Sequence, residues 1–225
     1  MAIFEKIKKL NLIFNFFYPS FCRYCNVLIE QDSIFCLNCF SKINPVATTF
    51  LPITKKKSLK VYSACEYKDP LRSLILKKTF SDILASKQLA KIILQKTILK
   101  KLDIDFIVPI PLHISRYAFR GYNQASVIAK VLGKELEIPY INLLRRKKRT
   151  IFQSKLSVSK RQSNLKDAFD IAFRYKIFNT DFIKNKNIML VDDLCTTGAT
   201  LKNAGRVLFN LKPKSICAVV ACRVV

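Results

Sequence analysis

The sequence predicts an α/β fold, a parallel sheet flanked by helices, with a small four-cysteine module in front of it. Short apolar stretches with strand character alternate with amphipathic helical stretches from about residue 59 onward, which is typical of parallel sheets covered on both faces. Two CxxC pairs lie close together near the N-terminus. The 225 residues are half hydrophobic and include only 4 Gly and 8 Pro, which excludes bulk disorder and low-complexity classes.

The cysteine pairs predict a structural metal site. They are Cys22-x2-Cys25 and Cys36-x2-Cys39. Four thiolates presented by two tight turns suit tetrahedral Zn²⁺ and leave no open coordination position for catalysis. Two disulfides are the alternative, and they require an oxidising compartment. Because residues 1–21 lack a signal-peptide cleavage pattern, we expect reduced cysteines and a cytoplasmic protein.

Residues 1–21 are expected to form an amphipathic helix that packs on the body of the protein. Ile3, Ile7, Leu10 and Phe14 fall on one face of such a helix. No apolar run reaches the ~18 to 20 residues that a bilayer span needs, so we expect no stable membrane insertion.

Three regions follow one another along the chain. The helix and zinc module are assigned to residues 1–45, a linker rich in Pro and Lys to 46–58, and the α/β domain to 59–225. Hydrophobic periodicity predicts the elements of that domain in order. Strands are expected at 59–67, 105–109, 138–144, 188–191 and 215–222, and helices at 70–102 (with a break near 81–82), 122–133 and 200–211.

The most informative segment follows the apolar strand 188–191. Two adjacent carboxylates, Asp192 and Asp193, come first, and a Thr/Gly-rich turn then leads directly into a helix. The turn and helix start suit a phosphate group, since Gly198 admits close backbone approach and the helix terminus offers N–H groups. The carboxylates suit a vicinal diol and Mg²⁺ instead. Together these groups describe a site for a ribose 5-phosphate. The expected phosphate loop comprises Thr196, Thr197, Gly198, Ala199 and Thr200.

The string VDDLCTTGAT, residues 191–200, resembles the phosphoribosyl pyrophosphate (PRPP) signature of type I phosphoribosyltransferases. The chain also resembles the ComF family of competence-associated proteins over nearly its full length. Four further stretches carry that resemblance in the same order. They are the CxxC pairs after a Tyr-Pro, IVPIPLH at 107–113, RGYNQ at 120–124, and Gln153-x2-Leu156 followed by Arg161-x2-Asn164-Leu165.

The resemblance implies a phosphoribosyltransferase-like fold and a set of site residues. Asp192 and Asp193 would hold the ribose hydroxyls, the 196–200 loop would hold the 5-phosphate, and Arg116 and Arg120 would grip the pyrophosphate. Cys195 departs from the signature, where an apolar or aromatic residue is expected. We expect a small thiol there to leave binding intact, and oxidation of that thiol is a hypothesis for closing the site.

The formal charge of +25, from 40 Lys+Arg against 15 Asp+Glu, suggests a polyanionic partner. Nine cations fall within 145–166, and no acid appears before Asp167. This segment is either a hood over the pyrophosphate or a track for single-stranded DNA. The expected DNA contacts are Arg145, Arg146, Lys147, Lys148 and Arg149.

The sequence alone is therefore compatible with three functions. The first is a ComF family protein that binds Mg²⁺-PRPP and takes part in DNA uptake for natural transformation, contacting single-stranded DNA in the cytoplasm. The second is an active phosphoribosyltransferase of nucleotide metabolism with no DNA role. The third is a zinc-dependent assembly module that docks a competence helicase. The residues identify no acceptor substrate, and they leave turnover of the PRPP site open.

Overall fold

The computed structural model describes residues 19–30, 33–54, 57–76, 83–112, 114, 117–118, 121–147, 168–177 and 179–225. Nearly all of the helix expected at 1–21 lies outside these ranges. The chain divides into two compact units, one formed by 1–44 with 68–78 and the other by 45–67 with 79–225. None of the helices in the described ranges combines the length and apolarity that a bilayer crossing requires.

The smaller unit contains the cysteine module. Its elements are β1 (Ser20–Phe21), β2 (Leu28–Ile29), α2 (Leu37–Ser41) and α3 (Leu71–Leu76). Strands β1 and β2 pair antiparallel, with Phe21 opposite Leu28. The turn between them closes at Asn26, whose φ of 62° is a left-handed conformation that asparagine tolerates better than most residues.

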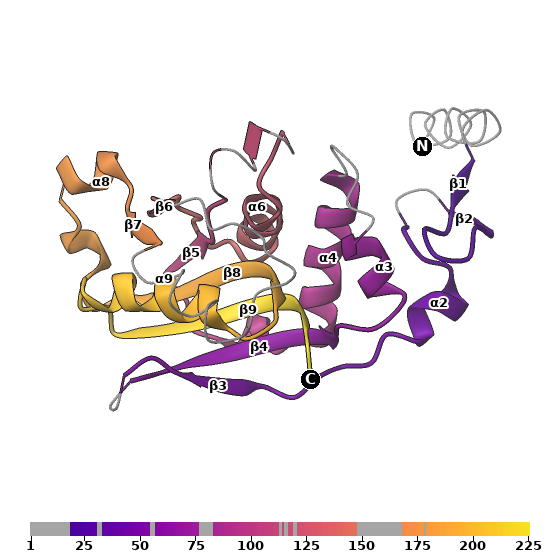
Figure 1. The fold of residues 1–225 in the computed structure, drawn as a ribbon, viewed down its shortest axis with the longest axis horizontal. Helices are drawn as coiled ribbons and strands as arrows, with labels where there is room; N and C mark the ends of the chain where they lie inside the picture. The colour runs from indigo at the N-terminus through magenta and orange to yellow at the C-terminus, as the bar shows by residue number, and fades with distance from the viewer. Residues whose placement is uncertain are drawn as a thin grey trace, which may run out of the picture. The chain divides into compact units, whose positions relative to one another are not determined.

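The larger unit is built on a five-stranded sheet in the order β3-β4-β9-β8-β5 (Figure 1). The strands β4, β9, β8 and β5 run parallel, and β3 is added antiparallel at the edge. This architecture confirms the predicted α/β class. The strands are β3 (Thr49–Pro52), β4 (Ser58–Glu66), β5 (Phe106–Pro109), β8 (Asn187–Cys195) and β9 (Ser215–Arg223). Its principal helices are α4 (Ile83–Lys96), α6 (Gln124–Leu136) and α9 (Ala199–Phe209), with a 3₁₀ turn η1 (Leu99–Lys101).

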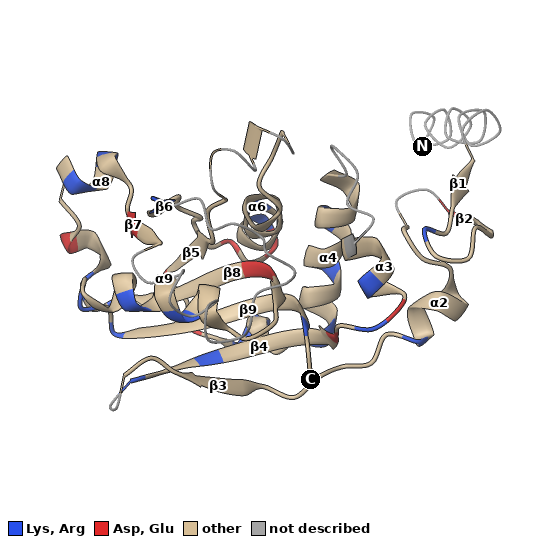
Figure 2. Ribbon diagram, in the orientation of Figure 1, with Lys and Arg blue, Asp and Glu red and all other residues tan. Residues whose placement is uncertain are grey.

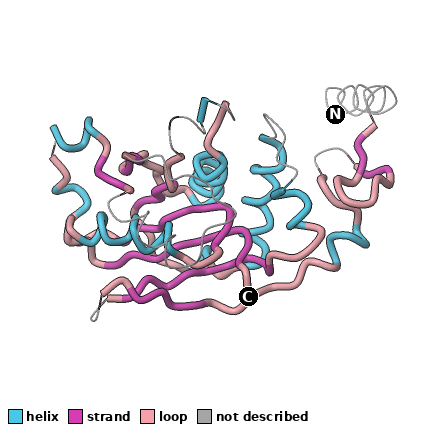
Figure 3. Tube along the Cα trace, in the orientation of Figure 1, coloured by secondary structure: helices cyan, strands magenta, loops and turns pink. Residues whose placement is uncertain are grey.

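Helices cover both faces of this sheet. Gly205 of α9 packs next to Leu59, and Gly133 of α6 packs next to Ile107. The register aligns Lys60 with Ile107 through the intervening strands, so Leu59 and Ile107 point to opposite faces. Helix α9 therefore covers one face, and α6, which contacts α4, covers the other (Figures 1 and 3).

The structure corrects two sequence expectations. Residues 49–52, which fall in the expected linker, form strand β3, and among the described strands only β4 pairs with it. Pro52 is tolerated at such an edge position. The strand expected at 138–144 is reduced to a single bridge between Tyr140 and Ile107. The chain then leaves the main sheet as β6 (Leu144–Arg146), which pairs antiparallel with β7 (Phe169–Ile171).

Beyond β7, two short elements return the chain to the sheet. They are α8 (Phe173–Ile177) and the 3₁₀ turn η2 (Asp181–Ile183). Phe182 of η2 packs edge-on against Phe106 at the start of β5, with ring centroids 5.7 Å apart. The segment α8–η2 therefore lies at the amino ends of the parallel strands.

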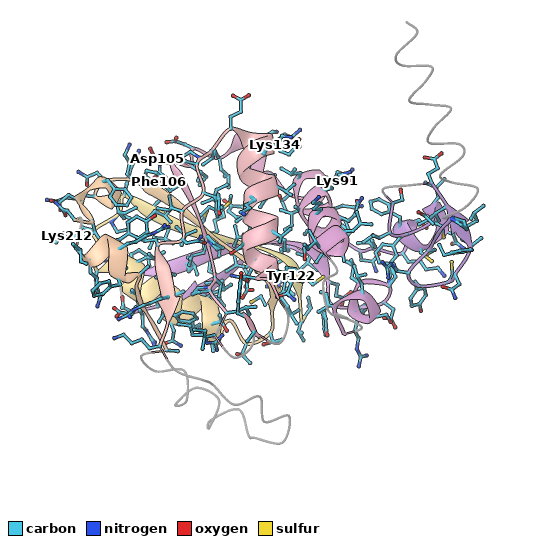
Figure 4. The ribbon with its side chains drawn as sticks, turned by 90° about the horizontal axis from the view of Figure 1, so that it is seen from above. Lys91, Asp105, Phe106, Tyr122, Lys134 and Lys212 are labelled. Atoms are coloured by element: carbon cyan, nitrogen blue, oxygen red, sulfur yellow. The ribbon has the colours of Figure 1, made fainter. Side chains whose placement is uncertain are left out.

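A polar network joins the amino ends of three strands. Asp105 accepts the Asn187 backbone N–H at 2.8 Å and the Lys186 ammonium at 2.9 Å. The buried Asn187 side chain donates to Asp103 and accepts from Ser215. Figure 4 shows Asp105 and Phe106 near one end of the sheet and Tyr122 near the other. The network therefore fixes strand register at the end away from Tyr122.

Asp105→Asn is expected to lower the free energy of unfolding by about 1 kcal/mol at neutral pH. The effect is modest because the Asp105 carboxylate is partly exposed and water screens its interactions. The Asn187 N–H, followed by the Lys186 ammonium, holds the pKa of Asp105 below its usual range. A lowered carboxyl pKa contributes stability above about pH 4, and that contribution is lost as the pH falls further. The difference between variant and wild type should therefore shrink below about pH 4.

Urea unfolding at neutral and acidic pH measures this effect. Glu135→Gln, an exposed charge removal on α6, is the control and should leave stability nearly unchanged at both pH values. A stability loss for Asp105→Asn that stays constant down to about pH 2 would contradict the assignment.

Candidate functional site

The two adjacent carboxylates lie within β8 near the carboxyl end of the sheet. The expected strand ended at residue 191, but β8 continues to Cys195 because β9 pairs with it as far as Arg223. Asp192 and Asp193 are both half-buried. Asp192 Oδ1 accepts the Asp193 backbone N–H at 2.9 Å, which orients the first carboxylate. Figure 2 shows the pair as the acidic stretch of β8.

The expected phosphate loop connects β8 to α9. Gly198 is the residue before the helix and has φ of 72°, a left-handed conformation that favours glycine. Thr196 and Thr197 are exposed, and the Thr197 hydroxyl accepts the Ala199 N–H at 3.4 Å. The structure thus brings the loop and the carboxylates together at the same strand end. Exposed hydroxyls beside a helix amino terminus are suited to an anion.

The loop is supported from the edge of the sheet. A Cβ atom on Gly198 would lie 2.5 Å from Leu51 Cδ1, so the loop rests directly on strand β3. This contact was not predicted, because β3 itself was assigned to a linker. The backbone conformation therefore favours glycine at 198, and any larger residue would also have to displace the Leu51 side chain.

Gly198→Ala is expected to weaken binding of a phosphate ligand at the loop by about tenfold, since left-handed strain and the Leu51 contact together cost about 1–3 kcal/mol. Calorimetric titration with PRPP measures it. Adding Leu51→Ala removes the contact and leaves the backbone strain, so the double variant should recover only part of the affinity. Unchanged affinity in Gly198→Ala would contradict the role of the loop.

Cys195 is a packing residue of this site. Its side chain is 3% exposed, and burial raises the pKa of the thiol to about 11, with the charge of Asp192 adding to the effect. A thiol that stays protonated at neutral pH and is shielded from solvent reacts slowly. The structure therefore gives no support to closing the site by oxidation of Cys195.

Two cations near the loop were missed by sequence reasoning. Arg223 pairs with Cys195, and the Lys202 backbone N–H donates to Gly198 O at 2.9 Å, so both residues lie beside the loop. Arg223 ends β9 beside Cys195, and its Nη2 donates to Ala47 O at 3.1 Å. Lys202 lies four residues after Gly198 on α9. The position of Arg223 follows from the parallel topology, because the carboxyl ends of neighbouring strands meet, whereas that of Lys202 follows from the first turn of α9.

The expected pyrophosphate loop follows β5. Asn123 fixes its far end, because its Nδ2 donates to Ile110 O at 2.9 Å while its Oδ1 caps α6. Arg116 and Arg120 lie outside the described residues. Their part in the site stays a prediction.

The four N-terminal cysteines form a cluster that could hold a metal ion. The sulfurs of Cys22, Cys25, Cys36 and Cys39 all lie within 4.8 Å of one another, and all four cysteines are free. Burial raises a thiol pKa, but N–H groups of Cys25, Cys36 and Tyr24 lower that of Cys22 to about 6. Burial and the neighbouring sulfurs raise the pKa of Cys39 to about 12. Without a cation, the cluster therefore favours the thiolate form of Cys22 and the protonated thiol of Cys39.

The described part of the basic segment is engaged within the protein. Arg145 and Lys147 both contact Asp170 Oδ2, at 2.9 and 3.2 Å, and the Arg146 guanidinium lies 5.4 Å from the centre of the Phe169 ring. Arg145 and Lys147 remain nearly half exposed. Lys148 and Arg149 lie outside the described residues, and DNA contact by the whole group stays a prediction.

Comparison with known proteins places this geometry in context. A family model described as "Phosphoribosyl transferase domain" matches residues 79–224. Competence protein F of Haemophilus influenzae is 38% identical over 111 residues, which cover 49% of this chain and 46% of that protein. Competence protein ComFC of Bacillus subtilis is 26% identical over 80% of each chain. DNA utilization protein YhgH of Salmonella typhimurium is 25% identical over 91% of this chain and 84% of its own length. The matched segment thus spans about half of the first relative and most of the other two.

Proposed function

The chain belongs to the phosphoribosyl transferase domain family and is ComFC-like, and from this premise we propose that it binds Mg²⁺-PRPP and takes part in DNA uptake for transformation. The observation that carries the PRPP proposal is the junction of β8 and α9. Two half-buried carboxylates and a loop held open by Gly198 meet there at the carboxyl end of a parallel sheet. Such strand ends are where open α/β sheets bind ligands.

Each part of the junction suits one part of PRPP. The carboxylates of Asp192 and Asp193 would accept hydrogen bonds from the two ribose hydroxyls. The N–H groups and hydroxyls of residues 196–200 would hold the 5-phosphate, and Lys202 supplies positive charge nearby. Arg116 and Arg120 are proposed for the pyrophosphate. Mg²⁺ would neutralise the diphosphate oxygens when bound. These residues position the ligand and stabilise its charge, which supports a leaving pyrophosphate as well as simple binding.

Zinc is the metal we propose for the cysteine cluster. Tetrahedral Zn²⁺ with Zn–S bonds of about 2.3 Å sets sulfurs about 3.8 Å apart. The Cys25 and Cys36 sulfurs are 3.6 Å apart, well beyond the ~2.05 Å of a disulfide bond. The Cys39 backbone N–H also donates to Cys36 Sγ at 3.4 Å, which stabilises a metal-bound thiolate.

Single-stranded DNA in the cytoplasm is proposed as the partner of the basic segment. Relatives carry the names competence protein and DNA utilization protein, and the chain has a net charge of +25. In the described part of the segment, the side chains of Arg145 and Lys147 are nearly half exposed although both contact Asp170, so phosphates can approach them from solvent. Electrostatic contact of this kind is independent of sequence.

Affinity for a single-stranded oligonucleotide is expected to fall by roughly 20- to 100-fold between about 50 and 200 mM salt, since three to five phosphate contacts release their counterions. Fluorescence anisotropy with a labelled oligothymidylate measures the slope. The Asp192→Asn variant is the control and should keep DNA binding, because its carboxylate belongs to the PRPP site. An affinity that does not change with salt concentration would contradict the DNA role and would not affect the PRPP proposal.

A further inference from the structure

A cavity of about 440 Å³ opens beside α8, away from the proposed PRPP site. Its wall comprises Ile171, Tyr175, Lys176, Asn179, Thr180 and Leu211. Leu211 follows α9, and Thr180 precedes η2 and β8, so the cavity lies at the amino ends of the strands. Figure 4 labels Lys212, next to Leu211, on the same side as Phe106 and away from Tyr122. The volume is in the range of small-ligand sites, which is about 300–1,000 Å³.

One wall of the cavity is a fixed aromatic ring. Tyr175 packs against Phe182 with centroids 5.8 Å apart, and Phe182 in turn packs against Phe106. The Arg174 guanidinium lies 4.6 Å from the Tyr175 centroid and donates to its hydroxyl at 2.9 Å. Ile171 and Leu211 lie beside the ring, and the remaining wall residues are polar. The wall therefore combines an ordered aromatic ring with hydrogen-bonding side chains, which together can receive a base.

Lys176, which lines the cavity, belongs to a cluster of three cations. Lys176 Nζ lies 2.8 Å from Asp170 Oδ2, and Arg145 and Lys147 contact that oxygen as well. Burial acts to raise the pKa of Asp170, but the hydrogen bonds from Lys176, Arg145 and Lys147 outweigh it and hold the pKa well below its usual range. Three positive charges thus surround one negative charge. The cation side chains are 44–47% exposed and Asp170 is 14% exposed, so an anion can approach from solvent.

We propose that this cavity binds a nucleotide, with its base on the Tyr175 side and its phosphate at Lys176 and the neighbouring cations. The aromatic wall and the excess positive charge are the two features that such a ligand needs. The nucleotide can be a free mononucleotide or one unit of a single DNA strand. In the second form the inference rests on the proposed DNA role, and two of the cations, Arg145 and Lys147, belong to the basic segment 145–166.

Two probes distinguish a free mononucleotide from one unit of a DNA strand. They are a fluorescent N-methylanthraniloyl derivative of AMP and an oligothymidylate of about twelve nucleotides. Lys176→Gln removes one cation, and Thr180→Trp fills the cavity. Lys91→Gln, an exposed charge removal on α4, is the matched control. We expect each cavity variant to lose about tenfold in affinity for the probe that binds, while the control matches wild type. Circular dichroism checks that each variant is folded.

The result identifies the source of the nucleotide. Losses with both probes, or with the mononucleotide alone, assign the cavity to free nucleotides; losses with the oligonucleotide alone assign it to a strand. Wild-type affinity for both probes in Lys176→Gln and Thr180→Trp overturns the inference, as does failure of the wild type to bind either probe. When both variants keep wild-type affinity for the mononucleotide and for the oligonucleotide, the inference is overturned and the proposed DNA role stays intact.

Discussion

Replacing Asp192 and Asp193 together with asparagine is expected to reduce the affinity for Mg²⁺-PRPP by at least about 100-fold. Each charge-assisted hydrogen bond to a ribose hydroxyl contributes about 1.5–3 kcal/mol, and asparagine keeps the size of the side chain without its charge. Both carboxylates are half-buried, so water compensates only partly for the lost interactions. Isothermal titration calorimetry measures the loss directly.

The control for this experiment removes a charge elsewhere on the same unit. Glu135→Gln lies on α6 and is exposed, and it should bind Mg²⁺-PRPP as the wild type does. Thermal unfolding shows whether the double variant retains its fold, since Asp192 Oδ1 also accepts the Asp193 N–H. Full PRPP affinity in a folded double variant would refute the site assignment.

Cys36→Ser is expected to abolish metal binding and to unfold residues 19–44. A structural zinc site contributes about 10–16 kcal/mol of apparent binding energy in small modules, and this module has little apolar core of its own. Metal content per chain should fall from about one to near zero, and amide protection in the module should be lost. Lowering the pH should release the metal in the wild type, because the thiolates become protonated.

Cys217→Ser is the matched control for the metal experiment. Cys217 lies on β9, outside the four-sulfur cluster, and burial raises its pKa to about 12. The variant should retain its metal. A Cys36→Ser protein that keeps one tightly bound metal and a protected module would refute the zinc assignment.

The parts of the fold that were predictable are those with local signatures. The apolar runs of β8 and β9 and the amphipathic pattern of α9 predict a strand, a helix and a strand in that order, and the structure has all three. Strand β3 escaped prediction because Pro52 and the nearby lysines are typical of a linker. Its stability comes from pairing with β4, a context that local sequence does not express.

The site divides in the same way. The carboxylates and the phosphate loop are adjacent in sequence, and the structure places them together as expected. Arg223 reaches the loop from another strand, and Arg145 meets Asp170 across 25 residues. The spacing of these residues in the sequence predicts neither the position of Arg223 beside the loop nor the ion pair between Arg145 and Asp170. Both follow only once the strand order and the β6–β7 pairing are known.

Because Leu51 contacts Gly198, ligand binding at the proposed phosphate loop would be coupled to the stability of the edge strand β3. Within the described residues, β3 has β4 as its lateral strand partner, and border strands fray more readily than central ones. A ligand that orders the loop should therefore also reduce fraying of β3. Conversely, fraying of β3 should remove the Leu51 contact and increase the mobility of the loop. The rigidity of the proposed ligand site therefore depends on the pairing of β3 with β4.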